Sequence, residues 1–325
     1  MMLARALLFL LIAIPGVAQN CESTAVGYRV LHMEGRVVAV WYPTRAHADD
    51  YTYHDTFSGV VGPDGAPSTV CGKRVPLVVF SHGDLGCGLQ SIAFTEELAR
   101  HGYVVAAPDH ADAFLCHTVP PATRTPHPHQ PDLFAPDTWN DTTVLDRRKD
   151  MEAVIDGLLS HGDLRTVIDA RRIGLAGHSL GGYTVVGMAG GWPSWVDPRI
   201  RAVLALSPYV MPFQVKKTLG SVHVPLMYQG GTLDVGITPF LKRPKGAYGD
   251  ANPPVYFMEL KNASHFAWVN CGKLHSVATC LASTENFRLI DEYGIAFFDR
   301  YLRNLPEPIL SKKETALADY RFRTE

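Results

Sequence analysis

The hydrophobic residues of the chain gather in short apolar runs that alternate with longer amphipathic stretches. Six mainly apolar runs have the length of strands buried on both faces of a sheet: residues 77–80, 104–107, 173–176, 203–206, 226–229 and 255–260. Four stretches have the spacing of helices with one apolar side: residues 91–101, 146–161, 183–189 and 287–302. Strands that alternate with helices predict a doubly wound, mostly parallel α/β sheet with helices on both faces.

Three regions depart from this alternation. Residues 28–42 alternate with period two around a break at residues 34–35, which predicts one or two antiparallel strands. Residues 43–74 are polar with Gly and Pro, which predicts a long loop with an edge hairpin. Residues 111–141 hold six prolines and three histidines, and so long a structureless stretch predicts a functional loop or lid. Its prolines keep the chain extended and no ligand partners have metal spacing, so no metal site is expected there.

The N-terminus has the pattern of a cleavable secretory signal over residues 1–18. Arg5 supplies a positive charge, residues 6–14 are uninterruptedly apolar, and Gly16 and Ala18 are small residues before a cut after Ala18. A membrane anchor needs about twenty apolar residues, roughly twice this run. We therefore expect a secreted or periplasmic protein with no membrane span.

Composition narrows the function classes. Hydrophobic residues make up 46% and charged residues 19% of the chain, as in ordinary globular domains. The formal net charge of −2 argues against a nucleic-acid partner. Six cysteines in an exported chain suggest disulfides, for which fifteen complete pairings exist. The candidate pairs are Cys271 with Cys280, Cys87 with Cys116, and Cys21 with Cys71.

The most specific motif reads Gly-His-Ser-Leu-Gly at residues 177–181, between an apolar run and a helical stretch. This is the G-x-S-x-G pattern of a nucleophile elbow, and the flanking strand and helix are the context that it needs. The glycines permit a sharp turn that holds the serine in a strained conformation. We predict that Ser179 is a nucleophile at the carboxyl end of the sheet, near a helix N-terminus.

A serine hydroxyl needs a base, and in such folds the chain order is serine, acid, histidine. Asp234 follows the strand predicted at 226–229, and His265 follows the one at 255–260, so both reach the end of the sheet where Ser179 lies. We favour this pair over the other candidates within reach along the chain. The competing acids are Asp197, Asp250 and Glu259, and the competing bases are His178, His223 and His275.

Backbone N–H groups complete the predicted site. Leu180, directly after the nucleophile, is one expected oxyanion donor, and Asp84, after the strand at 77–80, is the other. Alternatively, residues 82–83 form only a tight strand-to-helix turn. Candidates for shaping the substrate pocket, with core packing as the alternative for the aromatic ones, are Gly83, Tyr209, Phe266 and Trp268. The predicted chemistry requires no metal or organic cofactor.

Three segments of this sequence resemble a known family. They read Val-Val-Phe-Ser-His-Gly at 78–83, Leu-Ala-Arg-His-Gly-Tyr-Val-Val-Ala-Ala-Pro-Asp-His at 98–110, and Arg-Ile-Gly-Leu-Ala-Gly-His-Ser-Leu-Gly-Gly-Tyr at 172–183. They resemble the predicted dienelactone hydrolase family, which is related to platelet-activating-factor acetylhydrolases and more distantly to bacterial cutinases and polyester hydrolases. The resemblance spans roughly residues 35–300. It implies one α/β-hydrolase domain over residues 19–325 and a catalytic triad.

The chain departs from that family in two places. Dienelactone hydrolases use a cysteine nucleophile, whereas this chain has Ser179. Mammalian-type acetylhydrolases carry their acid after the strand that matches 203–206, and this chain has Ser-Pro-Tyr at 207–209. The placement of Asp234 resembles that of the cutinases, as does Ser-His-Phe-Ala at 264–267 followed by Cys271.

Taken together, these features predict an exported serine hydrolase of carboxylic esters with short-to-medium acyl, lipid or polyester substrates, acting through an acyl-enzyme. Its partner would be a small-molecule or polymeric ester. An acyltransferase or a peptidase on the same triad is an alternative, and a non-catalytic binding domain is another.

Overall fold

The computed structural model describes residues 24–53, 57–114, 132–270 and 284–325. The signal-peptide prediction and most of the predicted lid lie outside these ranges, as do Cys21, Cys116, Cys271 and Cys280. Cys71 and Cys87 are both disulfide-bonded, but the predicted pairings reach beyond the described residues.

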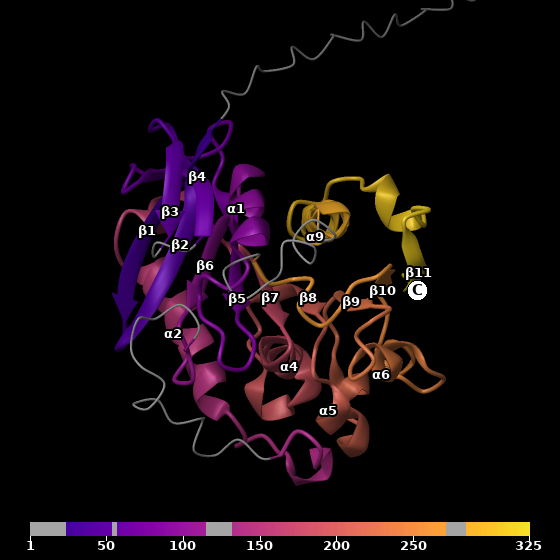
Figure 1. The fold of residues 1–325 in the computed structure, drawn as a ribbon. Helices are drawn as coiled ribbons and strands as arrows, with labels where there is room; N and C mark the ends of the chain where they lie inside the picture. Colours follow the sequence, from indigo (N-terminus) through magenta and orange to yellow (C-terminus); the bar gives the residue numbers. More distant parts are fainter. Residues whose placement is uncertain (1–23, 54–56, 115–131, 271–283) are drawn as a thin grey trace, which may run out of the picture.

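Eleven strands in the described part of the chain form one sheet in the order β11-β10-β9-β8-β7-β5-β6-β2-β1-β4-β3 (Figure 1). Their bounds are β1 Ala25–Met33, β2 Arg36–Thr44, β3 Asp49–Tyr53, β4 Phe57–Pro63, β5 Val75–Ser81, β6 Val104–Pro108, β7 Ile168–His178, β8 Ile200–Leu206, β9 Leu226–Gly231, β10 Val255–Leu260 and β11 Leu317–Arg323. Strands β5 to β10 pair in parallel, while β2 and β11 flank them in antiparallel pairing.

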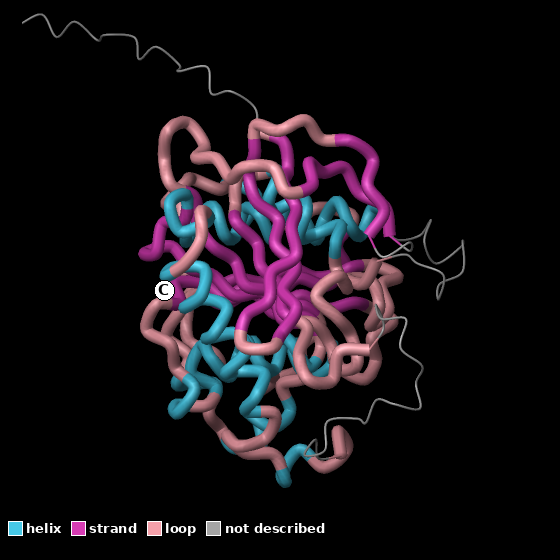
Figure 2. Tube along the Cα trace, turned by 90° about the vertical axis from the view of Figure 1, so that its left-hand side faces the viewer, coloured by secondary structure: helices cyan, strands magenta, loops and turns pink. Residues whose placement is uncertain are grey.

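Helices cover both faces of this sheet. Their bounds are α1 Ile92–Arg100, α2 Leu145–Ser160, α3 Leu164–Val167, α4 Leu180–Val186, α5 Met211–Lys216, α6 Thr238–Lys242, α7 Ala247–Asp250 and α9 Thr284–Leu302. Short 3-10 turns lie at Pro136–Thr138, Pro193–Trp195, Leu219–Ser221 and Pro308–Ser311, and a π-helical turn lies at Gly187–Gly191. Helices α1 and α9 pack on one face, and α2, α4, α5, α6 and α7 on the other (Figure 1). Figure 2 shows the twisted strands between these two helical layers.

The core explains why the central strands read as continuous apolar runs. Along β5, Leu77 and Val79 point to the face that carries α2 and α4, while Val78 and Phe80 point to the face that carries α1 and α9. Each of the four side chains is fully buried. A parallel strand covered on both faces has no solvent-facing side, so it keeps no polar alternation.

The predicted fold class is confirmed: the sheet is doubly wound and mostly parallel, as in the α/β-hydrolase fold. The predicted N-terminal strands are β1 and β2, which form an antiparallel hairpin across Glu34 (φ 47°) and Gly35 (φ 78°). The edge hairpin expected within residues 43–74 is β3 with β4.

The short helices α3, α5, α6 and α7 were not predicted, and two further differences have a clear physical reason. The helix expected to begin at residue 183 begins at Leu180, because Gly181 and Gly182 continue it in tight contact with neighbouring strands and loops. Strand β11, which was not predicted from the sequence, pairs with β10 at the edge of the sheet. Its three charged residues, Asp319, Arg321 and Arg323, suit an exposed border strand and conceal its strand character.

Among the helices in the part of the chain that the structure describes, none is both long enough and apolar enough to cross a bilayer.

Candidate active site

Ser179 occupies a strained turn between β7 and α4. Its backbone angles are φ 55° and ψ −114°, a conformation that a non-glycine residue keeps only when its surroundings impose it. Its N–H donates to the carbonyl of Leu206 at 3.0 Å, and its carbonyl accepts from the N–H groups of Tyr183 and Tyr209 at 3.0 and 3.1 Å. These bonds hold the side chain at the carboxyl end of the parallel strands.

The glycines of the motif are required by close approach. A Cβ at Gly177 would collide with the carbonyl of Gly181, and a Cβ at Gly181 would collide with the carbonyl of Ser81 on β5. Any larger residue would therefore push α4 away from the sheet and displace Ser179. The turn works because both neighbours lack side chains.

The structure brings Ser179, His265 and Asp234 together. The Oγ of Ser179 lies 2.9 Å from Nε2 of His265, whose Nδ1 lies 3.1 Å from Oδ2 of Asp234. Asp234 is 4% exposed, whereas 27% of the His265 side chain remains exposed. The acid is thus enclosed while the base and the serine face outward. This arrangement can activate a hydroxyl by passing its proton to the imidazole.

The competing acids lie elsewhere. Asp197 precedes β8 and Asp250 precedes β10, so both are at the amino end of the strands, opposite Ser179. Asp197 is paired with Arg199 at 2.7 Å. Glu259 is within β10 and pairs with Lys242 at 2.5 Å.

Two of the competing bases also fail to approach Ser179 in the described structure. His223 lies just before β9, at the amino end of that strand. His275 is outside the described residues.

The third competing base, His178, supports the site instead of acting in it. Its Nδ1 accepts from Nε2 of Gln90 at 2.7 Å, and its Nε2–H donates to the backbone carbonyl of His265 at 2.8 Å. Burial, and then the nearby His265, lower the pKa of His178 to about 3, so its ring is neutral. A neutral ring donates from one nitrogen and accepts at the other, which matches both bonds. His178 therefore fixes the segment that carries His265.

Hydrogen bonds fix the orientation of the loop after β5, which carries Asp84, the predicted second oxyanion donor. The Gly83 N–H is directed at Oε1 of Gln90 at 2.7 Å, and the Gly83 carbonyl accepts from Nη2 of Arg147 at 3.0 Å. In a trans peptide, carbonyl and N–H point in opposite directions, so the N–H of Asp84 points away from Arg147. The Asp84 side chain itself is exposed. Leu180, the other predicted donor, is the first residue of α4.

Arg147 on α2 anchors this loop from the interior. Its guanidinium donates to the carbonyls of His82 and Gly83 at 2.6 and 3.0 Å, and it pairs with Asp112 at 2.6 Å. Both members of the ion pair have fully buried side chains. The same oxygen of Asp112 accepts from the N–H of Leu85 at 3.1 Å. One buried ion pair thus ties both sides of the loop.

A second serine–histidine–aspartate set lies beside this anchor. Ser81 Oγ is 2.9 Å from Nε2 of His110, and Nδ1 of His110 is 2.9 Å from Oδ2 of Asp150. Asp150 also pairs with Arg36 at 2.9 Å. Ser81 is fully buried and His110 is 2% exposed, so no substrate can reach them. These three residues therefore have a structural role. Their lack of exposure to solvent distinguishes them from the set around Ser179.

Three buried histidines make stability depend on pH. Burial lowers the pKa of His82 and His178 to about 3, and it holds that of His110 well below its usual range. In the unfolded chain each titrates at about 6.5. Below that pH the unfolded chain binds more protons, so the free energy of unfolding should fall by about 1.4 kcal/mol per pH unit for each histidine.

Urea denaturation between pH 7.5 and pH 5 measures this slope. We expect His178→Asn to remove one histidine's share of the slope. An unchanged slope in that variant would show that His178 is protonated in the folded protein.

The candidates for the substrate pocket separate into two groups. Phe266, which follows His265 in the chain, is 57% exposed. A Cβ at Gly83 would lie 3.4 Å from Cβ of Ser179, so the glycine leaves room beside the serine. Tyr209 and Trp268 are only 3% and 2% exposed. Both of these rings are enclosed by packing, which favours core packing, the alternative given for the aromatic candidates, at Tyr209 and Trp268.

Specific contacts hold those two rings. The Tyr209 hydroxyl donates to the carbonyl of Leu133 at 2.7 Å. The Trp268 indole donates to Oε1 of Gln229 at 2.9 Å, and its ring stacks on His178. They shape the site by positioning other residues.

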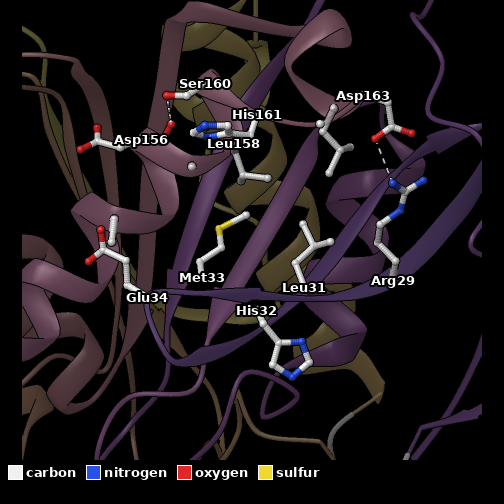
Figure 3. Close-up of a pocket in the computed structure, with 14 residues that line it drawn as sticks. Arg29, Leu31, His32, Met33, Glu34, Asp156, Leu158, Ser160, His161 and Asp163 are labelled. Carbon is white, nitrogen blue, oxygen red and sulfur yellow. Dashed lines mark hydrogen bonds and ion pairs between the residues drawn. The ribbon is translucent and has the colours of Figure 1, made fainter.

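A hollow of about 480 Å³ lies at the other end of the molecule, between β1 and the end of α2. Leu31, Met33 and Leu158 form its apolar floor, and Arg29 pairs with Asp163 at its rim at 2.9 Å (Figure 3). Ser160, His161 and Asp156 line it, but the Ser160 hydroxyl donates to the backbone carbonyl of Asp156, so these three side chains do not form a triad like that around Ser179. Among the described residues, no group of three or more metal-ligating side chains is found either.

Sequence reasoning missed three residues of the site. Gln90 and Arg147 carry no motif, and their roles follow from contacts between segments far apart in the chain. Ser207 was noted only for lacking a carboxylate, yet its hydroxyl contacts both Asp234 and His265. A polar residue at the end of a buried parallel strand is the one signal that pointed to it.

Comparisons with known proteins agree with this fold. The model of the family described as platelet-activating factor acetylhydrolase, isoform II, matches residues 64–132. Cutinase 2 of Thermobifida cellulosilytica is 26% identical over 175 residues, which are 51% of this chain and 57% of that protein. The platelet-activating factor acetylhydrolase of Cavia porcellus is 28% identical over 166 residues, covering 43% and 36%.

The chain spans about half the length of the relatives that it matches. A solved ferulic acid esterase from Streptomyces cinnamoneus superposes with a TM-score of 0.64, covering 96% of this chain and 98% of that one at 21% identity. At that identity the likeness bears on the fold alone. The fold is that of the α/β-hydrolases, and over part of its length the chain is similar to the cutinases and the platelet-activating factor acetylhydrolases.

Proposed function

We propose that this protein is a serine esterase that hydrolyses carboxylic esters through an acyl-enzyme. The observation that carries the proposal is the alignment of three side chains at the carboxyl end of the sheet. Ser179 Oγ is 2.9 Å from His265 Nε2, and Asp234 lies 3.1 Å from the other nitrogen of the same ring. Unlike the buried Ser81 and His110, Ser179 and His265 are partly exposed.

The proposed reaction has two halves. His265 takes the proton of Ser179 as Oγ attacks the ester carbonyl, and Asp234 holds the imidazole in the tautomer that leaves Nε2 free to accept. The N–H groups of Leu180 and Asp84 receive the developing oxyanion. His265 then gives the proton to the departing alkoxide, and water releases the acid by the reverse sequence. No step requires a metal or an organic cofactor.

Exposed apolar side chains around the site support an apolar ester as substrate. Each follows the carboxyl end of a parallel strand: Leu85 after β5, Leu233 and Val235 after β9, and Phe266 after β10. They are between 37% and 79% exposed. Together they make an apolar rim beside Ser179, which suits short-to-medium acyl chains, lipids or polyesters. The names of the relatives, among them cutinase and lipase, support an ester over a peptide.

Labelling with a fluorophosphonate tests the nucleophile. We expect one phosphonate per chain, found by peptide mass spectrometry on Ser179, and none on Ser81, because Ser81 is fully buried. Denaturation before labelling should abolish the reaction, since activation depends on His265. Folded protein that stays unlabelled would contradict the proposal and would favour a non-catalytic binding domain.

A series of p-nitrophenyl esters, from acetate to octanoate, tests the substrate class. If the rim receives the acyl chain, kcat/KM should rise with each added methylene before it levels off, by up to roughly threefold per methylene. The matched p-nitroanilides should be cleaved far more slowly. Faster cleavage of the anilides would favour a peptidase, and transfer to an added alcohol without hydrolysis would favour an acyltransferase.

Export belongs to the same proposal, and it depends on residues 1–18. The intact mass of protein recovered from a secreting host tests it: we expect a mature chain that begins at Gln19.

A further inference from the structure

Ser207 lies directly after β8, in contact with two residues of the proposed triad. Its hydroxyl donates to Oδ2 of Asp234, and its Oγ is 2.9 Å from Nδ1 of His265. Asp234 and His265 are themselves 3.1 Å apart at these same two atoms. The three polar atoms thus form a closed triangle. Ser207 is fully buried, so the contact is not made with solvent.

The backbone of Ser207 is strained. Its φ is 43°, in the left-handed region that favours glycine, and the following Pro208 restricts it further. Its N–H donates to the carbonyl of Gln229 at 2.8 Å, and the preceding Leu206 carbonyl receives the N–H of Ser179 at 3.0 Å. A glycine would satisfy this backbone without strain. The chain has a serine there instead, and its hydroxyl meets the acid and the base.

The hydrogen-bonding capacity of the hydroxyl suits a bridge. A hydroxyl has one proton to donate and two lone pairs that accept. Its proton is directed at the carboxylate of Asp234, which can only accept. Its oxygen is therefore oriented to accept the Nδ1–H of His265. The Nδ1–H of His265 then has two acceptors, Oγ of Ser207 and Oδ2 of Asp234. Nε2, the other ring nitrogen, carries no proton and lies 2.9 Å from Oγ of Ser179.

We propose that Ser207 is a positioning residue of the esterase: it bridges Asp234 and His265 and orients the imidazole toward Ser179. This inference rests on the proposed function of the same site. The residue does not touch the substrate, so its removal should slow the chemical step and leave substrate binding intact.

Two variants separate the hydroxyl from the backbone strain. Ser207→Ala removes the hydroxyl and keeps the strain, whereas Ser207→Gly removes both. We expect both variants to lower kcat on p-nitrophenyl butyrate by about 10- to 100-fold, as for loss of a hydrogen bond to charged groups, with KM unchanged within about twofold. We expect the glycine variant to be at least as stable as the alanine variant. Full activity in Ser207→Gly would overturn the proposal, because the site would then work without the hydroxyl.

A double-mutant cycle with Asp234→Asn excludes a merely structural role. The asparagine variant favours the wrong imidazole tautomer, so the bridge has nothing left to orient. Adding Ser207→Ala to it should therefore slow the reaction less than about twofold, measured as the rate of fluorophosphonate labelling of Ser179. Losses that multiply would overturn the bridge. Wild-type protein that labels at Ser179 but cleaves no ester would contradict the proposed substrate, and the labelling rates would still decide the role of Ser207.

Discussion

Replacement of Ser179 by alanine is expected to lower kcat for ester hydrolysis by about 10⁵- to 10⁶-fold. The variant loses the oxygen that would form the acyl-enzyme, while the proposed oxyanion donors, the N–H groups of Leu180 and Asp84, are retained. The residual rate should therefore exceed that of the ester in water alone by about 10³-fold. Steady-state kinetics on p-nitrophenyl butyrate measure the loss, and the elbow should keep its shape because alanine is smaller than serine.

The matched control is Ser160→Ala, at the end of α2. Ser160 is exposed and its hydroxyl donates only to the carbonyl of Asp156, so kcat should stay within about twofold of the wild type. The double variant Ser179→Ala with His265→Ala should be no slower than Ser179→Ala alone, since the two act as a unit. A decrease in kcat of less than about tenfold in Ser179→Ala would contradict the proposed mechanism, because another group would then be the nucleophile.

Replacement of Arg147 by methionine is expected to lower the free energy of unfolding by about 3–5 kcal/mol. The change leaves Asp112 fully buried without its ion-pair partner. It also removes the donor to the carbonyl of His82 and one of the polar contacts of the carbonyl of Gly83, so the peptide that carries the Asp84 N–H is held less firmly. We expect kcat to fall by about 10²-fold, comparable to the loss of an oxyanion donor.

Two further variants separate stability from positioning. Arg147→Met combined with Asp112→Leu removes the unpaired charge and should recover much of the stability while kcat stays low. Arg288→Met on α9 breaks an exposed pair with Glu285 and should cost less than about 1 kcal/mol. Urea denaturation and kinetics measure both quantities. Recovery of kcat together with stability in the double variant would show that Arg147 does not position the loop.

Much of the fold was predictable because its signals are local. A parallel strand covered on both faces is apolar along its length, so β5 to β10 each stand out in the sequence. The elbow was predictable for the same reason, since Gly177 and Gly181 are required by contacts within a few residues of Ser179 or on the adjoining strand. The edge strand β11 was not predicted, because its half-exposed and charged residues give only a weak hydrophobic pattern.

Local sequence was a poorer guide to side-chain roles. Tyr209 and Trp268 were candidates for the pocket, yet both rings are enclosed by packing. Ser81, His110 and Asp150 reproduce the geometry of a triad in the interior, where nothing can reach them. Whether an aromatic ring or a serine faces solvent depends on what packs over it, and that is decided by residues far away in the chain.

The sequence by itself determined the doubly wound sheet and the elbow around Ser179, and it supplied the proposed order of serine, acid and base along the chain. These follow from strand periodicity and from the rule that carboxyl ends of parallel strands meet at one place. Only the tertiary structure decided which polar residues support the site: His178 behind His265, Arg147 beneath the loop of Asp84, and Ser207 between acid and base. Such contacts join segments separated by dozens of residues, and no local pattern encodes them.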